Sequence, residues 1–339
     1  MRNRLFLFVS VVLLCSSTFC VFGQGSLTPP PEALSGGNPV PFMKTLDQVE
    51  PRKLIKELPY IIDKSGSYYL TATLNGEGGE FGLLIKSNDV KIDLNGFAID
   101  GKGAAGVGIY VPDAYQNIHI RNGVVRGWVQ AGIDGSKVTG GRYIDVIASE
   151  NGGDGLVIGA NSMVVDCGSF DNGARGIVAG IGATVKNCKT RGNGSTGIVV
   201  NASSRISDCL AASNARAGIV LGASCTAKGC IATGNTTDGI VVSTRCRITG
   251  NNSTGNVKSG ILIAGNGNII SGNSFSGNTT GITADTTTKK NLIIKNYANE
   301  NTEQNYNVDP KDNSFGGFVS EPGAIPDTAG PWINFDLQQ

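Results

Sequence analysis

The sequence repeats a four-residue anchor every 21 residues: Gly155-Leu-Val-Ile, Gly176-Ile-Val-Ala, Gly197-Ile-Val-Val, Gly218-Ile-Val-Leu, Gly239-Ile-Val-Val and Gly260-Ile-Leu-Ile. A fixed period of this length indicates one structural unit per repeat, stacked on its neighbours. Each repeat holds three short extended runs, and none is long enough for a helix. Stacked copies would pair in parallel about 4.8 Å apart, so residues 155–280 predict three long parallel sheets.

Alternation along each run predicts which residues face the core. In the first run, the inward column after the anchor glycine is aliphatic, and it contains Leu156, Ile177, Ile198, Ile219, Ile240 and Ile261. A column of cysteines recurs in the third run at Cys167, Cys188, Cys209 and Cys230. A column of asparagines follows at Asn172, Asn193, Asn214, Asn235 and Asn256, with Asn278 displaced by one. An amide in that column can bridge to the turns above and below.

Other solenoids fit less well. A left-handed hexapeptide helix needs a period divisible by six, and a leucine-rich repeat needs a leucine-dominated pattern with a helical back. Here β-branched residues dominate and leucine is scarce. The pattern therefore favours an all-β, right-handed parallel β-helix of about ten turns.

The Gly-Ile-x-Val anchors and the Cys and Asn columns resemble the right-handed parallel β-helix repeat proteins, the group with pectate lyase-like folds. Met43-Lys-Thr-Leu-Asp-Gln-Val-Glu-Pro-Arg, followed by Ser65-Gly-Ser-Tyr-Tyr-Leu-Thr, resembles the N-terminal signature of secreted bacterial β-helix proteins of undefined function. The resemblance implies the fold for residues 43–339. It leaves the chemistry open, because this fold hosts lyases, hydrolases, adhesins and proteins without catalytic activity.

The remaining sequence suggests five regions. Residues 1–23 have the basic start, apolar stretch and small-residue exit of a secretory signal. We therefore expect a secreted protein, extracellular or at the cell surface, with the periplasm as the alternative and with no membrane span after cleavage. Residues 24–42 are a Pro, Gly and Ser-rich linker. Residues 43–81 form an N-terminal cap, with a short helical turn at 45–50, and the first strand. Residues 82–305 form the β-helix, and residues 306–339 form a C-terminal capping tail that shields its last turn.

Composition excludes strong overall attraction to nucleic acid, because the net charge is only +1 and 16% of residues are charged. Residues 155–280, however, hold ten basic and four acidic residues, about +6. Periodicity places Lys186 and Lys228 in one column and Arg205 and Arg247 in another. One face would then carry spaced positive charge that could bind an acidic polysaccharide.

Catalytic candidates are weaker. Anchor spacing is irregular before Gly155, and functional loops on solenoids often lie where the repeat is broken. There, a pectate-lyase mechanism would need clustered aspartates for calcium and a basic residue for proton abstraction. The weak candidates for such a site are Asp93, Asp100, Asp113, Arg121 and Arg126. Asp166 and Asp208, two turns apart, could form an inverting glycosidase pair, although solvated turn aspartates explain them better.

No metal site or cofactor is expected from the sequence. Neighbouring cysteines in the columns fall within disulfide range, but parallel in-register side chains are poorly oriented for the required torsion. Tetrahedral zinc needs converging ligands, whereas a column supplies a line. The pattern therefore favours free, buried thiols, with disulfides as the alternative.

An outward column of the first run is unexpectedly apolar. Its members are Val157, Val178, Val199, Val220, Val241 and Leu262. A contiguous apolar stripe suggests cover by another segment or self-association. Together these features predict a secreted protein with a non-catalytic structural or carbohydrate-binding role. The alternatives are a polysaccharide lyase or glycoside hydrolase with its site in residues 82–154, and an oligomeric adhesin.

Overall fold

The computed structural model describes residues 34–35, 38–39, 50–284, 286–320 and 330–337. The chain divides into two compact units, residues 1–51 and 52–339. In the first unit, β1 (Leu34–Ser35) and β2 (Asn38–Pro39) pair antiparallel. The predicted signal peptide, most of the linker and almost all of the helical turn expected at 45–50 lie outside the described residues. Among the described residues, no helix is long and apolar enough to cross a bilayer.

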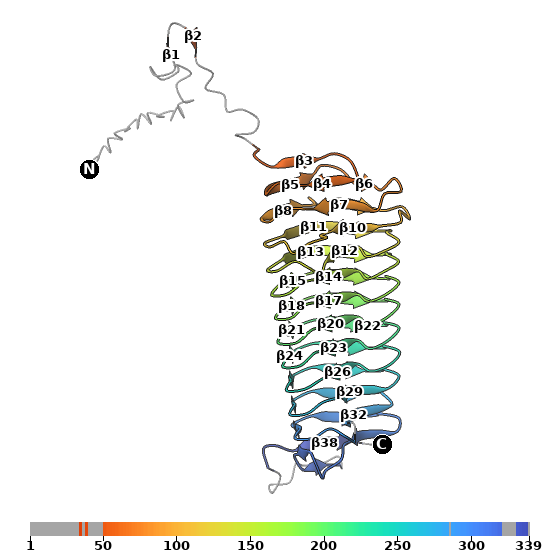
Figure 1. Ribbon diagram of the computed structural model, residues 1–339. Helices are drawn as coiled ribbons and strands as arrows, with labels where there is room; N and C mark the ends of the chain where they lie inside the picture. Colours follow the sequence, from red (N-terminus) through yellow and green to blue (C-terminus); the bar gives the residue numbers. More distant parts are fainter. Residues whose placement is uncertain (1–33, 36–37, 40–49, 285, 321–329, 338–339) are drawn as a thin grey trace, which may run out of the picture. The chain divides into compact units, whose positions relative to one another are not determined.

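The second unit is an all-β, right-handed parallel solenoid of about twelve turns, slightly more than the ten predicted (Figure 1). Each turn contributes one strand to a 12-stranded parallel sheet, here called the front sheet. Its strands are β4 (Tyr60–Ile62), β7 (Phe81–Ile85), β10 (Val107–Tyr110), β12 (Ile133–Gly135), β14 (Leu156–Ile158), β17 (Ile177–Ala179), β20 (Ile198–Val200), β23 (Ile219–Leu221), β26 (Ile240–Val242), β29 (Ser259–Ile263), β32 (Thr280–Ala284) and β35 (Gln304–Asn307).

Two further parallel ladders complete each turn. The side ladder contains β3 (Lys53–Ile55), β5 (Gly66–Leu70), β8 (Val90–Asp93), β11 (His119–Arg126), β13 (Arg142–Ser149), β15 (Met163–Val165), β18 (Thr184–Lys186), β21 (Arg205–Ser207), β24 (Thr226–Lys228), β27 (Arg247–Thr249), β30 (Ile269–Ser271), β33 (Leu292–Ile294) and β36 (Ser314–Phe315).

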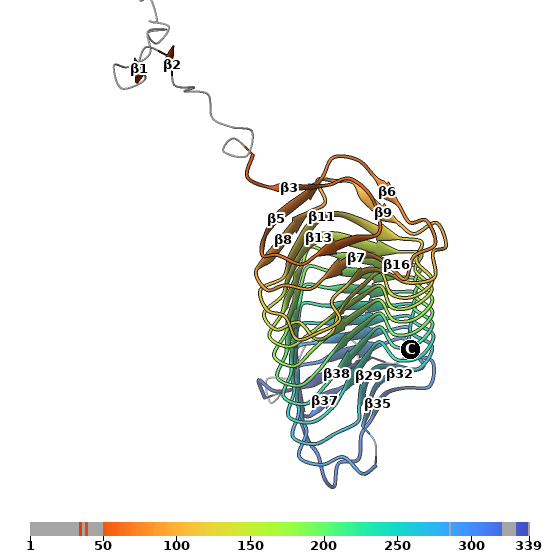
Figure 2. The ribbon, with the colours of Figure 1, turned by 45° about the horizontal axis from the view of Figure 1, so that its top comes forward.

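The back ladder contains β6 (Leu74–Asn75), β9 (Ala98–Asp100), β16 (Gly168–Phe170), β19 (Lys189–Arg191), β22 (Leu210–Ala212), β25 (Ile231–Thr233), β28 (Asn252–Thr254), β31 (Ser274–Ser276), β34 (Tyr297–Asn299), β38 (Asn334–Leu337) and β37 (Phe318–Val319). The eight-residue strands β11 and β13 run through both ladders. Figure 2 shows β5 and β8 on one side of the coil and β6 and β9 on another. The three predicted runs per turn are therefore present.

Corners between the ladders explain the abundance of Asp, Asn, Ser and Gly. Residues there adopt the left-handed backbone region, as at Asn161 (φ 53°), Asp166 (φ 56°) and Asp171 (φ 53°). These residue types tolerate that conformation better than others do. Asp208 occupies the same corner as Asp166, with φ 56°. The corner position supports the reading of both aspartates as turn residues.

The anchor glycines are required by close approach between turns. A Cβ added to Gly176 would lie 2.5 Å from the carbonyl oxygen of Gly197, and one on Gly218 would lie 2.8 Å from that of Gly239. Both distances are shorter than real Cβ contacts, so either substitution would displace the backbone. The next residue of each anchor can then point into the core, where Ile177 and Ile198 are fully buried.

Buried asparagines join successive turns. Asn172 Nδ2 donates to Asn193 Oδ1 of the next turn at 2.9 Å. In the same way, Asn193 Nδ2 donates to Asn214 Oδ1 at 2.9 Å, and Asn214 Nδ2 donates to Asn235 Oδ1 at 3.0 Å. The backbone N–H of each residue donates to the same oxygen of the next turn. The predicted amide column is confirmed, and it satisfies polar groups inside the core.

The ends of the solenoid depart from the repeat. Parallel pairing begins at β3, within the segment expected to be the cap and first strand. At the other end, β36 and β38 of the expected capping tail pair in parallel with the last turns. The tail therefore adds parallel strands to the last turns, and the solenoid ends with these strands.

Candidate functional site

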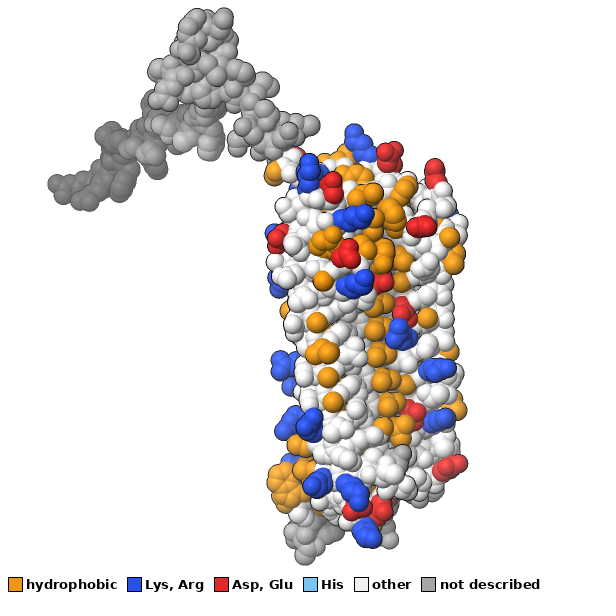
Figure 3. Space-filling model, viewed as in Figure 1, with side chains coloured by type: hydrophobic (Ala, Val, Ile, Leu, Met, Phe, Trp, Pro, Cys, Tyr) orange, Lys and Arg blue, Asp and Glu red, His pale blue; other side chains and the backbone are white. Residues whose placement is uncertain are grey.

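Four predicted basic residues lie on one outward face of the side ladder; Lys186, Arg205, Lys228 and Arg247 are here called the basic track. Strand register aligns Lys186 with Ser207 and then Lys228, and it aligns Arg205 with Thr226 and then Arg247. Each of four successive turns thus presents one cation, alternating between two columns. Figure 3 shows basic side chains at its left edge, the side on which β18, β21 and β24 lie in Figure 1.

The basic track faces solvent. All four side chains are exposed, and none forms an ion pair with another described residue. Neighbouring turns are about 4.8 Å apart, so positive charge recurs at about that interval along the axis. Asp166 and Asp208 lie at the corner beside this face. Asp166 accepts a hydrogen bond from Asn187 Nδ2 at 2.6 Å.

Farther toward the N-terminus, the same face contains a small pocket. It has a volume of about 260 Å³ and is lined by Arg52, Ser67, Lys91, Ile92, Asp93, His119 and Arg121. Arg121 donates from Nε and a terminal nitrogen to Asp93 Oδ2, at 3.1 and 2.7 Å. Arg52 lies 3.8 Å from that oxygen and 4.5 Å from the centre of the Tyr69 ring.

The ion pairs govern the charge of Asp93. Burial raises the pKa of this carboxyl, but hydrogen bonds from the Asn95 backbone and Arg121 outweigh burial and lower the pKa overall. Asp93 therefore stays ionised at neutral pH. The carboxylate accepts two hydrogen bonds from Arg121 and holds that side chain in place.

Asp100 forms a second, separate cluster on β9. A terminal nitrogen of Arg126 lies 3.0 Å from Asp100 Oδ2, and Lys102 Nζ lies 2.9 Å from the same oxygen. Asp113 is exposed in the loop after β10. The described residues include no group of three or more His, Cys, Asp or Glu side chains that could hold a metal ion. The structure thus joins Asp93 with Arg121 and Asp100 with Arg126, but it does not bring the three aspartates together as a calcium site.

A second hollow, of about 410 Å³, lies over β10 and β12. Its lining includes Glu80, Tyr110, Gln130 and Asp134. Sequence reasoning missed this pair of carboxyl groups because Glu80 and Asp134 lie in turns whose spacing breaks the period.

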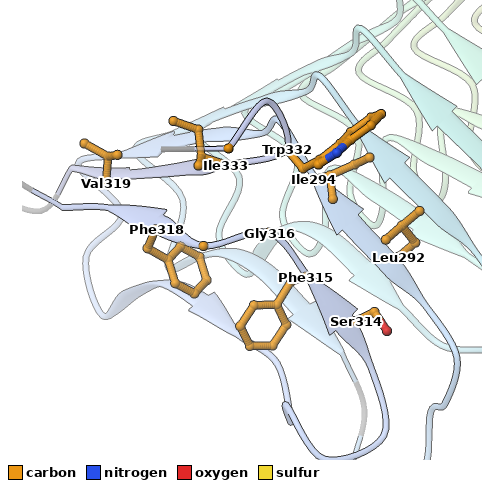
Figure 4. Close-up of a pocket in the computed structure, with 11 residues that line it drawn as sticks. Leu292, Ile294, Ser314, Phe315, Gly316, Phe318, Val319, Trp332 and Ile333 are labelled. Atoms are coloured by element: carbon orange, nitrogen blue, oxygen red, sulfur yellow. The ribbon is translucent and has the colours of Figure 1, made fainter. Parts of the chain in front are cut away.

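An apolar groove of about 710 Å³ lies near the C-terminal end, between β33, β36, β37 and the segment before β38. Figure 4 shows Phe315 and Phe318 together on one side, with Ile294 and Trp332 across from them. The Trp332 side chain is 56% exposed, and Lys295 Nζ lies 4.6 Å from its ring centre. The sequence places Phe315, Phe318 and Trp332 in the capping tail, but it does not predict a groove there.

The cysteine columns are confirmed as free and buried: Cys167, Cys188, Cys209, Cys225, Cys230 and Cys246. The Cys188 thiol donates to the Lys186 carbonyl oxygen at 3.1 Å. Hydrogen bonding with the thiols of Cys167 and Cys209, together with burial, raises the pKa of Cys188. The thiols follow one another along the axis and do not converge on a point.

The apolar stripe predicted on the first run also forms. Register aligns Val157, Val178 and Val199 across β14, β17 and β20, and the alignment continues to Leu262. Val178 is 9% exposed, and the other five members are partly exposed. Figure 3 shows hydrophobic side chains in a line down the front sheet.

Known structures resemble this solenoid. The A-module of mannuronan C-5 epimerase AlgE6 from Azotobacter vinelandii aligns with a TM-score of 0.68 at 16% identity, over 80% of this chain and 91% of that chain. The AlgE4 A-module from the same organism aligns with a TM-score of 0.60 at 19% identity, over 75% and 91%. The Dettilon tailspike protein aligns with a TM-score of 0.56 at 13% identity, over 84% and 61%. At these identities the likeness shows the fold alone.

A comparison with curated protein sequences gives no match. A family model described as "Periplasmic copper-binding protein (NosD)" matches residues 129–323, which is more than half of the chain. That region runs from the irregular turns through every regular repeat and into the C-terminal tail. By this match and by its parallel β-solenoid, the chain belongs to the NosD family.

Proposed function

We propose that this protein binds an acidic polysaccharide along the basic track, without catalysis, outside the cytoplasm. The observation that carries the proposal is one exposed, unpaired cation on each of four successive turns. A rigid sheet holds these charges at a regular interval, and a polymer with regularly spaced carboxylates can contact several of them at once. Support by analogy comes from the epimerases of the same fold, whose names specify the polysaccharide mannuronan.

Binding should be electrostatic and dependent on salt. The track is exposed, so each contact contributes about 0.2–1 kcal/mol and weakens as counterions screen it. Affinity for a polyuronate such as polygalacturonate should exceed affinity for neutral dextran at low salt, and the difference should shrink at high salt.

A matched pair of variants tests the track. Lys186→Gln with Arg205→Gln removes two charges from the side ladder, whereas Lys189→Gln with Arg191→Gln removes a lysine and an arginine from neighbouring β19 on the back ladder. The track variant should weaken polygalacturonate binding about fivefold in a calorimetric titration, and the back-ladder variant should not. Equal effects from the two variants would refute the assignment.

Copper does not fit the described residues. The single histidine of the sequence, His119, lies among Lys91, Arg121 and Arg142, whose charges disfavour a cation. The cysteine thiols are buried and follow one another along the axis, so they do not supply the converging set of ligands that a metal ion needs. We therefore assign these residues no copper chemistry, although the family description names copper.

A glycoside hydrolase or lyase is the second candidate. It is favoured by the hollow that contains Glu80, Tyr110 and Asp134, partly within the region predicted to hold such a site. Incubation with polygalacturonate or alginate should then release new reducing ends or unsaturated products. That activity should be lost in Glu80→Gln. Binding without product formation supports the non-catalytic function.

A further inference from the structure

We propose that the pocket around Arg52, Lys91 and Arg121 binds a single oxyanion group, the carboxylate or sulfate of a sugar-sized ligand. The site is separate from the basic track and does not rest on the proposed function. Between them, Arg142 continues one column from His119, and β15 then interrupts both columns with the uncharged Met163 and Val165. The volume of about 260 Å³ is below the usual range of small-molecule sites, so it suits one charged group or one sugar ring.

The charge balance of the pocket favours an anion. Three cationic side chains line it, and Asp93 is the one acidic residue among the lining. Asp93 already accepts from Arg121 and, through Oδ1, from the Asn95 backbone at 2.9 Å. Lys91 is exposed and forms no ion pair with a described residue. With a neutral histidine, the lining keeps an excess of two positive charges.

The second observation is an unsatisfied imidazole in the wall. His119 Nε2 is buried and has no hydrogen-bond partner among the described residues. Leaving a buried polar atom unpaired costs free energy, and such an atom in a native structure often marks an absent water or ion. An anion oxygen that enters the pocket would accept a hydrogen bond from this edge of the ring and from a neighbouring cation.

The charges around His119 link binding to its protonation. Burial lowers the pKa of the imidazole, Arg121, Arg142 and Lys91 lower it further, and Asp93 opposes them. These groups come from β8, β11 and β13, and Arg52 adds a fourth cation from the segment before β3. A bound anion would offset this repulsion, so the pKa of His119 should rise when the pocket is filled.

The sequence contains one histidine, so one imidazole signal reports the site in protein without a histidine tag. The test follows this signal by NMR while galacturonate, galactose or sulfate is added at constant ionic strength set with chloride. Galacturonate should shift the signal saturably and raise the midpoint of its pH titration by about one unit, whereas galactose should not.

Saturation by both galacturonate and sulfate indicates the shared oxyanion chemistry. Saturation by galacturonate alone indicates that the ligand is a carboxylate attached to a sugar. Saturation by sulfate alone indicates that the ligand is a free oxyanion. No saturable shift with either, or an equal shift with galactose, overturns the proposal.

Variants assign the shift to this pocket. Lys91→Gln should weaken galacturonate binding about fivefold, because it removes a charge that no ion pair constrains. Lys189→Gln removes another exposed lysine, from β19, and should leave the affinity unchanged. Arg121→Gln is avoided, since it would strip the buried Asp93 of its partner. An unchanged affinity in Lys91→Gln overturns the assignment. Because the probe is a monosaccharide, failure of polymer binding at the basic track would not affect this result.

Discussion

At the residue scale, the corner between the side and back ladders accepts either a cysteine or an asparagine at one position of the repeat. Cys188, Cys209 and Cys230 occupy the place that Asn251 takes in the next turn, and the Cys230 backbone N–H donates to Asn251 Oδ1 at 2.9 Å. The Cys188 backbone N–H likewise lies 3.4 Å from Cys209 Sγ. A thiol is a weaker acceptor than an amide, but it fills the corner and donates to a nearby carbonyl. The cysteines therefore act as corner residues as well as core filler.

Truncation of one asparagine side chain in the amide column should lower the stability of the protein. Asn214→Ala removes an acceptor from buried Asn193 and a donor to Asn235. We expect it to lower the free energy of unfolding by about 2 kcal/mol, measured by urea denaturation, because buried polar groups lose their partners. Asn201→Ala is the control, since that side chain is exposed. Equal stability of the two variants would show that the column contributes little.

The thiols should be inaccessible until the protein unfolds. In protein that begins at Gln24, a thiol reagent without reductant should find at least four reactive groups after denaturation and almost none before it, because all six described cysteines are buried and free. Finding none after denaturation would mean that the cysteines are oxidised in the compartment where the protein resides.

At the element scale, a three-residue strand of the side or back ladder presents one inward column between two outward ones, as in β18 and β19. A regular front-sheet strand such as β20 presents one outward column between two inward ones. Stacking converts each position into a continuous surface. This geometry produces the basic track on the side ladder and the apolar stripe on the front sheet. The stripe extends over six strands, from Val157 to Leu262. Its length and continuity favour burial, either by another segment of the chain or by a second copy.

Lysines introduced into the stripe test that interpretation. Val199→Lys with Val220→Lys should lower the melting temperature or the mass in solution, because burying two unpaired ammonium groups is costly. Ala212→Lys with Thr233→Lys adds the same charges at partly exposed positions of the back ladder. If the stripe variant keeps its melting temperature and its mass, the stripe is simply exposed.

At the scale of the whole molecule, the two ends differ from the middle because they lack a neighbouring turn. Near the N-terminus, fully buried Trp128 fills the wider, irregular turns. A Cβ added to Gly82 or Gly101 would lie 2.8 Å from its ring. At the C-terminus, the Phe318 ring packs 4.8 Å from that of Tyr306 and 5.3 Å from that of Phe315, measured between centroids. Asn334 ends one amide column by accepting from Asn296.

Removal of the tail should expose the last turn. We expect truncation after Asp312 to lower the melting temperature and promote association, because it removes β36, β37 and β38 and uncovers unpaired strand edges. The comparison is Trp332→Ala, which alters an exposed side chain and keeps these strands. A truncated protein with the stability of the full chain would show that the tail does not cap the solenoid.

The sequence by itself determined the parallel solenoid, its inward columns, the amide column, the basic track and the apolar stripe. It could do so because a constant period sets the register, and residues 21 apart must then be neighbours. Tertiary structure alone decided what lies where the period fails. The pocket that contains His119 also contains Arg52, Asp93 and Arg121, which come from turns of unequal length. Because their spacing in the sequence is irregular, it does not predict that they lie together. Likewise, the groove lined by Phe315, Phe318 and Trp332 depends on how an aperiodic tail covers the final strands. There, side-chain packing and free strand edges determine the arrangement, and both exist only once the chain has folded.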